Sequence, residues 1–87
     1  MKTFDDLVFK PHSIGVGRFK ASLDLGNDIE VSVVYGDGLY GDGKTTFEVA
    51  AWFKTLMTFV PMPDDNNIVG GVSKDEVTKI INYLENL

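Results

Sequence analysis

The sequence RFKASLDLGNDIEVSVVY, residues 18–35, carries the clearest structural pattern in the chain. Apolar and polar side chains alternate through both halves of this stretch. Strict alternation is typical of strands that bury one face. Gly26, Asn27 and Asp28 separate the two halves and have the composition of a hairpin turn. We therefore predict an antiparallel hairpin over residues 18–35.

The next apolar stretch, residues 45–60, fits two periodicities. A strand would place alternate residues on one face, whereas a helix would align Val49 with Trp52. The stretch is rich in Thr, Val, Phe and Trp, which favour strands, and it lacks a strong helix cap. We therefore predict two strands, near 45–53 and 56–60, joined by a bend or bulge, and keep the helix as the alternative.

The C-terminal part of the chain predicts a helix over residues 73–86. Gly70-Gly71 indicates a flexible or positive-φ segment before it. Ser73 and Glu76 have the spacing of a capping box, in which each side chain bonds the backbone of the other residue. Apolar residues then recur at helical spacing. They are Val77, Ile80, Ile81, Leu84 and Leu87.

These elements predict an α+β fold in a single domain over residues 1–87. We expect an antiparallel meander of three to five strands, with the C-terminal helix packed on one face. The buried face of the sheet would carry the apolar residues of the alternating runs. They are Phe19, Ala21, Leu23, Ile29, Val31, Val33, Phe47, Val49 and Ala51.

Composition narrows the classes of function. The chain has 87 residues, no cysteine and a net charge of −5. The lack of cysteine excludes disulfides and thiolate chemistry and fits a reducing cytoplasm. The acidic balance disfavours direct nucleic-acid binding and favours basic partner surfaces. The chain has no apolar run of membrane-spanning length and carries acids where a signal peptide needs apolar residues, so we expect a cytoplasmic protein without a membrane partner.

One nucleotide-binding pattern is present. Residues 38–45, GLYGDGKT, match G-x-x-x-x-G-K-[ST], in which Lys44 would reach phosphates and Thr45 would hold magnesium. A helix should begin at Lys44, whereas strand-forming residues follow it. The strand before the match also belongs to an antiparallel hairpin. We therefore expect a glycine-rich loop from Gly38 to Thr45, with nucleotide or phosphate binding as the alternative function.

Other residues that could carry chemistry form no recognisable constellation. His12 is the one histidine and follows Pro11 in a predicted loop. Asp37 and Asp42 lie among glycines, but the spacing of a calcium loop is absent. We expect no catalytic residues, no metal site and no cofactor, and hence a protein that is not an enzyme.

The other face of the predicted sheet is a candidate partner-binding surface. Trp52, Ala50 and Val34 would point away from the helix, with charged residues around them. An apolar centre with a charged rim is typical of an interface, and tryptophan is common at its centre. We add Leu39 and Tyr40 of the glycine-rich loop to this surface. In the alternative, the N-terminal segment covers the face through Phe4, Leu7 or Phe9.

The order of short motifs along the chain resembles a loose group of small, uncharacterised bacteriophage-encoded proteins of similar length. The motifs are Phe9-Lys10-Pro11-His12, Val31-Ser32-Val33-Val34, Tyr40-Gly41, Phe47-Glu48-Val49-Ala50, Asp64-Asp65, Ile68-Val69-Gly70 and Ser73-Lys74-Asp75-Glu76-Val77. In that group the stretch after Tyr40-Gly41 resembles a strand, and the turn that holds the nucleotide-binding match varies. The glycine-rich loop here is longer than in the group.

The resemblance implies a function but carries over no catalytic residue. Small acidic bacteriophage proteins often bind proteins of the host, and some inhibit host defence or nucleic-acid enzymes. We therefore expect a protein that binds a host or bacteriophage protein in the host cytoplasm and that also self-associates, as a homodimer or larger homo-oligomer. A structural or assembly accessory of the bacteriophage particle is the other alternative.

Overall fold

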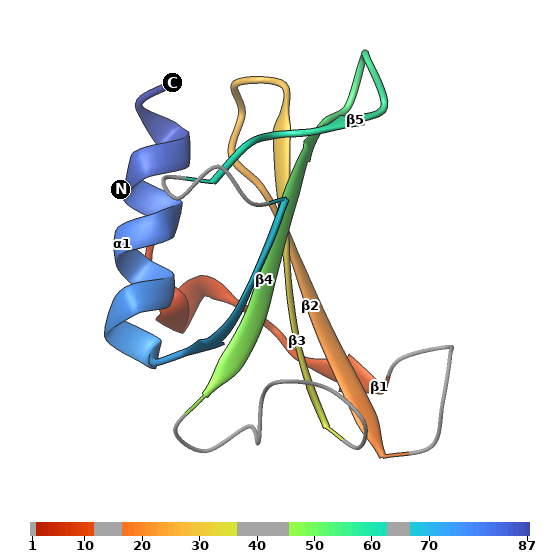
Figure 1. The fold of residues 1–87 in the computed structure, drawn as a ribbon, viewed down its shortest axis with the longest axis vertical. Helices are drawn as coiled ribbons and strands as arrows, with labels where there is room; N and C mark the ends of the chain where they lie inside the picture. The colour runs from red at the N-terminus through yellow and green to blue at the C-terminus, as the bar shows by residue number, and fades with distance from the viewer. Residues whose placement is uncertain (1, 12–16, 37–45, 63–66) are drawn as a thin grey trace.

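The computed structural model describes residues 2–11, 17–36, 46–62 and 67–87 (Figure 1). It shows one antiparallel sheet with a C-terminal helix on one side, which confirms the α+β class. The elements are η1 (Phe4–Asp6), β1 (Lys10–Pro11), β2 (Arg18–Asp24), β3 (Ile29–Gly36), β4 (Phe47–Phe53), β5 (Thr58–Phe59), β6 (Ile68–Val72) and α1 (Lys74–Glu85). The strand order is β1-β2-β3-β4-β5, and β6 also pairs with β4.

The hairpin of β2 and β3 confirms the prediction from the alternating stretch. Leu23 lies opposite Val31 and Ala21 lies opposite Val33. The backbone N–H of Leu25 donates to the carbonyl of Ile29 at 3.0 Å and closes the turn. Apolar residues opposite one another therefore point to the same side of the sheet, where they form one buried layer.

The stretch that fitted two periodicities forms two strands, not a helix. β4 ends at Phe53, a turn covers residues 54–57, and β5 pairs back onto the end of β4. Met57 adopts a left-handed conformation with φ 57°, and its N–H donates to the carbonyl of Phe53 at 2.8 Å. This turn is the bend predicted between the two strands.

The sheet has six strands, more than the three to five predicted, because Ile68–Val72 forms a strand where a flexible or positive-φ glycine segment was expected. Val69 pairs with Val49 and Val72 pairs with Phe47, so two residues of β6 face one residue of β4. Such a bulge needs a residue with an unusual conformation, and Gly71 supplies it with φ 70°. The glycine pair therefore allows the strand to continue through the bulge.

The helix α1 begins with the predicted capping box. The Ser73 hydroxyl accepts from the N–H of Glu76 at 3.2 Å, and the Ser73 N–H donates to Oε1 of Glu76 at 3.3 Å. The first four residues of the predicted apolar stripe are buried, but Leu87 is 58% exposed because α1 ends at Glu85. The amide of Asn27 in the β2–β3 turn donates to the carbonyl of Leu84 at 2.9 Å, which ties this turn to the end of α1.

The core lies between α1 and one face of the sheet. Of the nine sheet residues predicted to be buried, seven are buried and two, Phe19 and Leu23 on β2, are half-buried. The core also contains apolar residues from outside the alternating runs. They are Leu7, Leu25, Val60, Met62 and Val72 together with the buried face of α1.

The N-terminal segment packs on this same side of the sheet. The ring of Phe4 lies 4.9 Å from that of Phe47, and the ring of Phe9 lies 5.9 Å from it. The N–H of Phe4 also donates to the hydroxyl of Thr78 on α1 at 3.0 Å. The alternative in which this segment covers the opposite face is therefore wrong.

Candidate functional site

The face of the sheet opposite α1, called the open face below, carries the other half of each alternating strand. Among the described elements, none lies over this face, because α1 and η1 both lie on the core side (Figure 1). The register places its side chains in rows across the strands. The rows are Lys20, Val34 and Glu48; Ser22, Ser32, Ala50 and Ile68; and Asp24, Glu30, Trp52 and Phe59.

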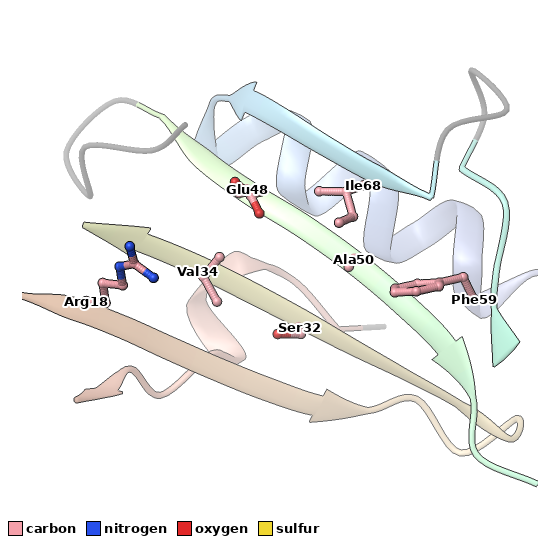
Figure 2. A pocket seen from close by; sticks show the side chains of 7 residues that line it. All are labelled: Arg18, Ser32, Val34, Glu48, Ala50, Phe59 and Ile68. Atoms are coloured by element: carbon pink, nitrogen blue, oxygen red, sulfur yellow. The ribbon is translucent and has the colours of Figure 1, made fainter. Parts of the chain in front are cut away.

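The centre of the open face is hollowed. Figure 2 shows Ser32 and Ala50 side by side on β3 and β4, and their small side chains form the floor of the hollow. The hollow has a volume of about 250 Å³. Phe59 stands at one end and Arg18 at the other, so the wall is aromatic at one end and charged at the other (Figure 2).

Phe59 and Ile68 supply the most accessible apolar surface at the hollow. They are 49% and 48% exposed, respectively. They reach the open face because β5 and β6 both pair with β4, one after the other along its edge. Their exposure is notable because the solvated face of an antiparallel sheet is normally polar.

Trp52 adjoins this hollow at the aromatic end. Its ring is half-buried and lines a second hollow of about 200 Å³ with Met57 and Phe59. The Nζ of Lys20 lies 5.8 Å from the ring centroid, a distance at which a cation is attracted to the ring face. Glu30 lies opposite Trp52 on β3. Trp52 therefore combines an apolar surface with charged neighbours of both signs.

The turn between β4 and β5 extends the apolar surface beyond the sheet. Leu56 and Met57 are 67% and 80% exposed. Asp28 anchors this turn: its carboxylate accepts from the hydroxyl of Thr55 at 2.7 Å, and its carbonyl accepts from the N–H of Lys54 at 2.8 Å. The exposed side chains of Leu56 and Met57 are thus carried by a turn that is hydrogen-bonded to Asp28 of the β2–β3 turn.

An ion pair joins Asp24 and Lys54 at the same end of the sheet. The hydrogen bond from Lys54, with a second from the N–H of Gly26, lowers the pKa of Asp24. The same hydrogen bond raises the pKa of Lys54. Both groups are therefore charged at neutral pH, and they form part of the rim around Trp52.

The structure brings three of the predicted partner-binding residues together. Trp52, Ala50 and Val34 all lie on the open face. Leu39 and Tyr40 lie outside the described residues. Sequence reasoning missed Phe59, Ile68 and Met57 as part of this surface. The alternation of apolar and polar residues could not assign these side chains to a face. β5 has only two residues, β6 contains a bulge, and Met57 lies in a turn.

The nucleotide-binding match also lies outside the described residues, but its flanks are described. β3 before it pairs antiparallel with both neighbours, and Phe47–Phe53 after it forms β4. A phosphate-binding loop of this pattern joins a parallel strand to a helix. The flanking elements here are two strands of a meander. His12, Asp37 and Asp42 likewise lie outside the described residues.

Two further observations concern the described part of the chain. No three acidic, histidine or cysteine side chains gather there in an arrangement that could hold a metal ion. Its one α-helix is too short and too polar to cross a membrane.

Comparison with known proteins gives no relative: no family model, curated protein or solved structure matches the chain.

Proposed function

We propose that this protein is a non-enzymatic binding protein that holds another protein on the open face of its sheet. One observation carries the proposal. One face of the sheet, which no described element covers, carries the apolar residues Val34, Ala50, Trp52, Phe59 and Ile68. Most other apolar sheet residues are buried in the core under α1 or packed against it.

The energetics support a binding role for this face. Burying a side chain as large as phenylalanine or isoleucine contributes about 1.5–3 kcal/mol, so covering the exposed half of Phe59 or Ile68 contributes about 1 kcal/mol each. Contiguous apolar surface with a polar rim is a common mark of a protein interface. The hollow over Ser32 and Ala50 adds a recess that can receive a side chain of the partner.

The proposed partner is a host or bacteriophage protein. This part of the proposal rests on the resemblance to small bacteriophage-encoded proteins and on the net charge of −5. Glu30 lies opposite Trp52, whereas Asp24 of the same row is already paired with Lys54. A partner that places a basic residue on Glu30 beside an apolar contact therefore fits this end of the face. A host defence or nucleic-acid enzyme, which carries such basic surfaces, would be inhibited by occlusion.

A retention experiment tests the proposal. Tagged wild-type protein is incubated with bacterial lysate beside Ile68→Lys, which places a charge on the open face. Leu87→Lys is the matched control, because Leu87 is also an aliphatic residue that is about half exposed, but it lies at the end of α1. We expect the wild type and Leu87→Lys to retain the same lysate protein in similar amounts. The amount retained by Ile68→Lys should be at least about tenfold lower, since a buried unpaired charge costs more than about 1.4 kcal/mol. Equal retention by all three proteins would contradict a role for the open face.

A further inference from the structure

We propose that the open face binds a second copy of this chain, with the two faces stacked about a two-fold axis that runs across the strands. This inference rests on the proposed function and names one partner for the same face. A host protein would then compete with the second copy. The shape of the face, its charge pattern and the size of the chain support it, and the area of the face limits how strong the association can be.

In this orientation the raised part of the open face in one copy meets the hollow of the open face in the other. Bulky Trp52 and Phe59 occupy one row. The hollow over Ser32 and Ala50 begins in the next row, beside Phe59 (Figure 2). A two-fold axis across the strands, placed over the Ser32 and Ala50 row, reverses the strand direction in the second copy. Each strand then lies over the same strand of the other copy, so Trp52 lies over Glu48 and Glu30 lies over Val34, at the far end of the hollow.

The charges of β2 match in the same orientation. Lys20 and Asp24 lie on either side of Ser22, which shares the central row. The axis therefore places Lys20 of each copy over Asp24 of the other, which gives two such contacts in the dimer. An axis along the strands would instead stack β2 over β4, which pairs Lys20 with Glu48 and leaves Asp24 over Trp52. The two axes therefore differ in whether Asp24 takes part in the charge contacts between the copies.

The available area lies just below the range of stable specific interfaces. Strands about 4.8 Å apart that rise about 3.4 Å per residue give four strands of seven residues a footprint of roughly 450 Å². Two such faces bury about 900 Å² before the relief of the side chains is counted, whereas specific interfaces begin near 1,000–1,200 Å². A reversible dimer fits this area, and a permanent one does not.

The size of the chain favours such a dimer. A domain of 87 residues buries only about 60–65% of the surface that its unfolded chain exposes. Association is a common way for small domains to add apolar burial. Since α1 covers only one side of the sheet, a second copy on the open face would complete a symmetric layered structure.

Sedimentation equilibrium over a wide range of protein concentration tests the inference. We expect the wild-type mass to rise from 9.6 kDa toward twice that value. Ala50→Arg fills the hollow with a charged side chain and should keep the monomer mass throughout, as should Ile68→Lys at the edge of the face. Leu87→Lys should associate like the wild type. Far-UV circular dichroism confirms that each variant folds.

A charge exchange tests the orientation of the two copies. Lys20→Glu alone and Asp24→Lys alone each place like charges against one another in the dimer and should weaken association. An equimolar mixture of the two variants restores both opposite-charge contacts, so it should associate more tightly than either variant alone. Equal association of the mixture and the separate variants would exclude the proposed axis.

The outcomes separate this inference from the proposed function. A wild type that stays monomeric at every concentration overturns the second copy, and the proposed function survives if lysate retention still depends on Ile68. A dimer that Ala50→Arg and Ile68→Lys leave intact also overturns the inference, because another surface then forms the dimer. Dimer formation and lysate retention that are both insensitive to these substitutions would overturn both proposals.

Discussion

At the scale of single residues, three side chains organise the end of the sheet that carries Trp52. Asp28 holds the β4–β5 turn through Thr55 and adopts a left-handed backbone with φ 68°, which aspartate tolerates better than most residues. Asp24 and Lys54 close the same end with an ion pair. Asp28, which the sequence indicated as a residue of the hairpin turn, therefore also holds in place the β4–β5 turn beside Trp52.

The Asp24–Lys54 pair predicts a small loss of stability in acid. Because the pKa of Asp24 in the folded chain lies below its ordinary value of 3.8, its contribution to the free energy of unfolding is present above that value and is lost as the pH falls through the folded pKa. The effect is small because both groups are exposed to water. We expect a carboxyl NMR titration of Asp24 to have a midpoint below 3.8 that rises in Lys54→Met.

Salt provides the control for this titration. Raising the ionic strength should move the midpoint of Asp24 upward in the wild type, because exposed charges are screened, and should move it less in Lys54→Met. A midpoint that is the same in both proteins would show that the ion pair does not persist in solution.

At the scale of elements, glycines set where strands end or bend. Gly36 ends β3 with φ 128°, and a Cβ there would lie 2.2 Å from the carbonyl oxygen of Gly17. Gly71 forms the bulge of β6 with φ 70°, and a Cβ there would meet nothing within 4 Å. The first position is restricted by conformation and by space, the second by conformation alone.

Alanine substitutions should separate these two restrictions. We expect Gly71→Ala to lower the free energy of unfolding by about 1 kcal/mol, the cost of a left-handed alanine. Gly36→Ala should lower it by about 3 kcal/mol or more, because the backbone of β2 or β3 must also move. Urea unfolding measures both values. Equal losses would contradict the close approach of Gly36 to Gly17.

The elements also show how far local patterns extend. The hairpin and the capped helix were predicted with bounds close to those observed, because alternation, turn residues and the Ser73–Glu76 box act over short distances. β6 was missed because Gly70-Gly71 is as typical of a loop as of a bulge. Its pairing with β4 is a long-range property that no local pattern contains.

At the scale of the whole molecule, the sheet has one covered face and one open face. The aromatic N-terminal segment adds to the covered face through Phe4 and Phe9, so the apolar residues of the open face lack that cover. The open face is therefore the side of the sheet on which the proposed partner and the proposed second copy would add apolar burial.

Mass action turns this arrangement into a thermal prediction. If two open faces associate, the midpoint of thermal unfolding should rise with protein concentration, since a partner that binds only the folded state stabilises it. The midpoint of Ala50→Arg should not depend on concentration. Differential scanning calorimetry at several concentrations measures both proteins, and a wild-type midpoint that stays constant would count against self-association.

The residues alone were sufficient for the α+β class, the hairpin, the capped helix and most of the buried sheet face, because period-two and helical spacing and the turn and cap residues act locally. They also placed Trp52, Ala50 and Val34 on one face through simple alternation. The assembled fold was needed to decide between strand and helix for the stretch that forms β4 (Phe47–Phe53), a turn and β5 (Thr58–Phe59), and to show that β6 joins the sheet. It was also needed to place the N-terminal segment against Phe47. These outcomes depend on which segments, distant in the sequence, pack against one another. The pairing of β5 and β6 with β4 placed Phe59 and Ile68 beside the hollow of the open face.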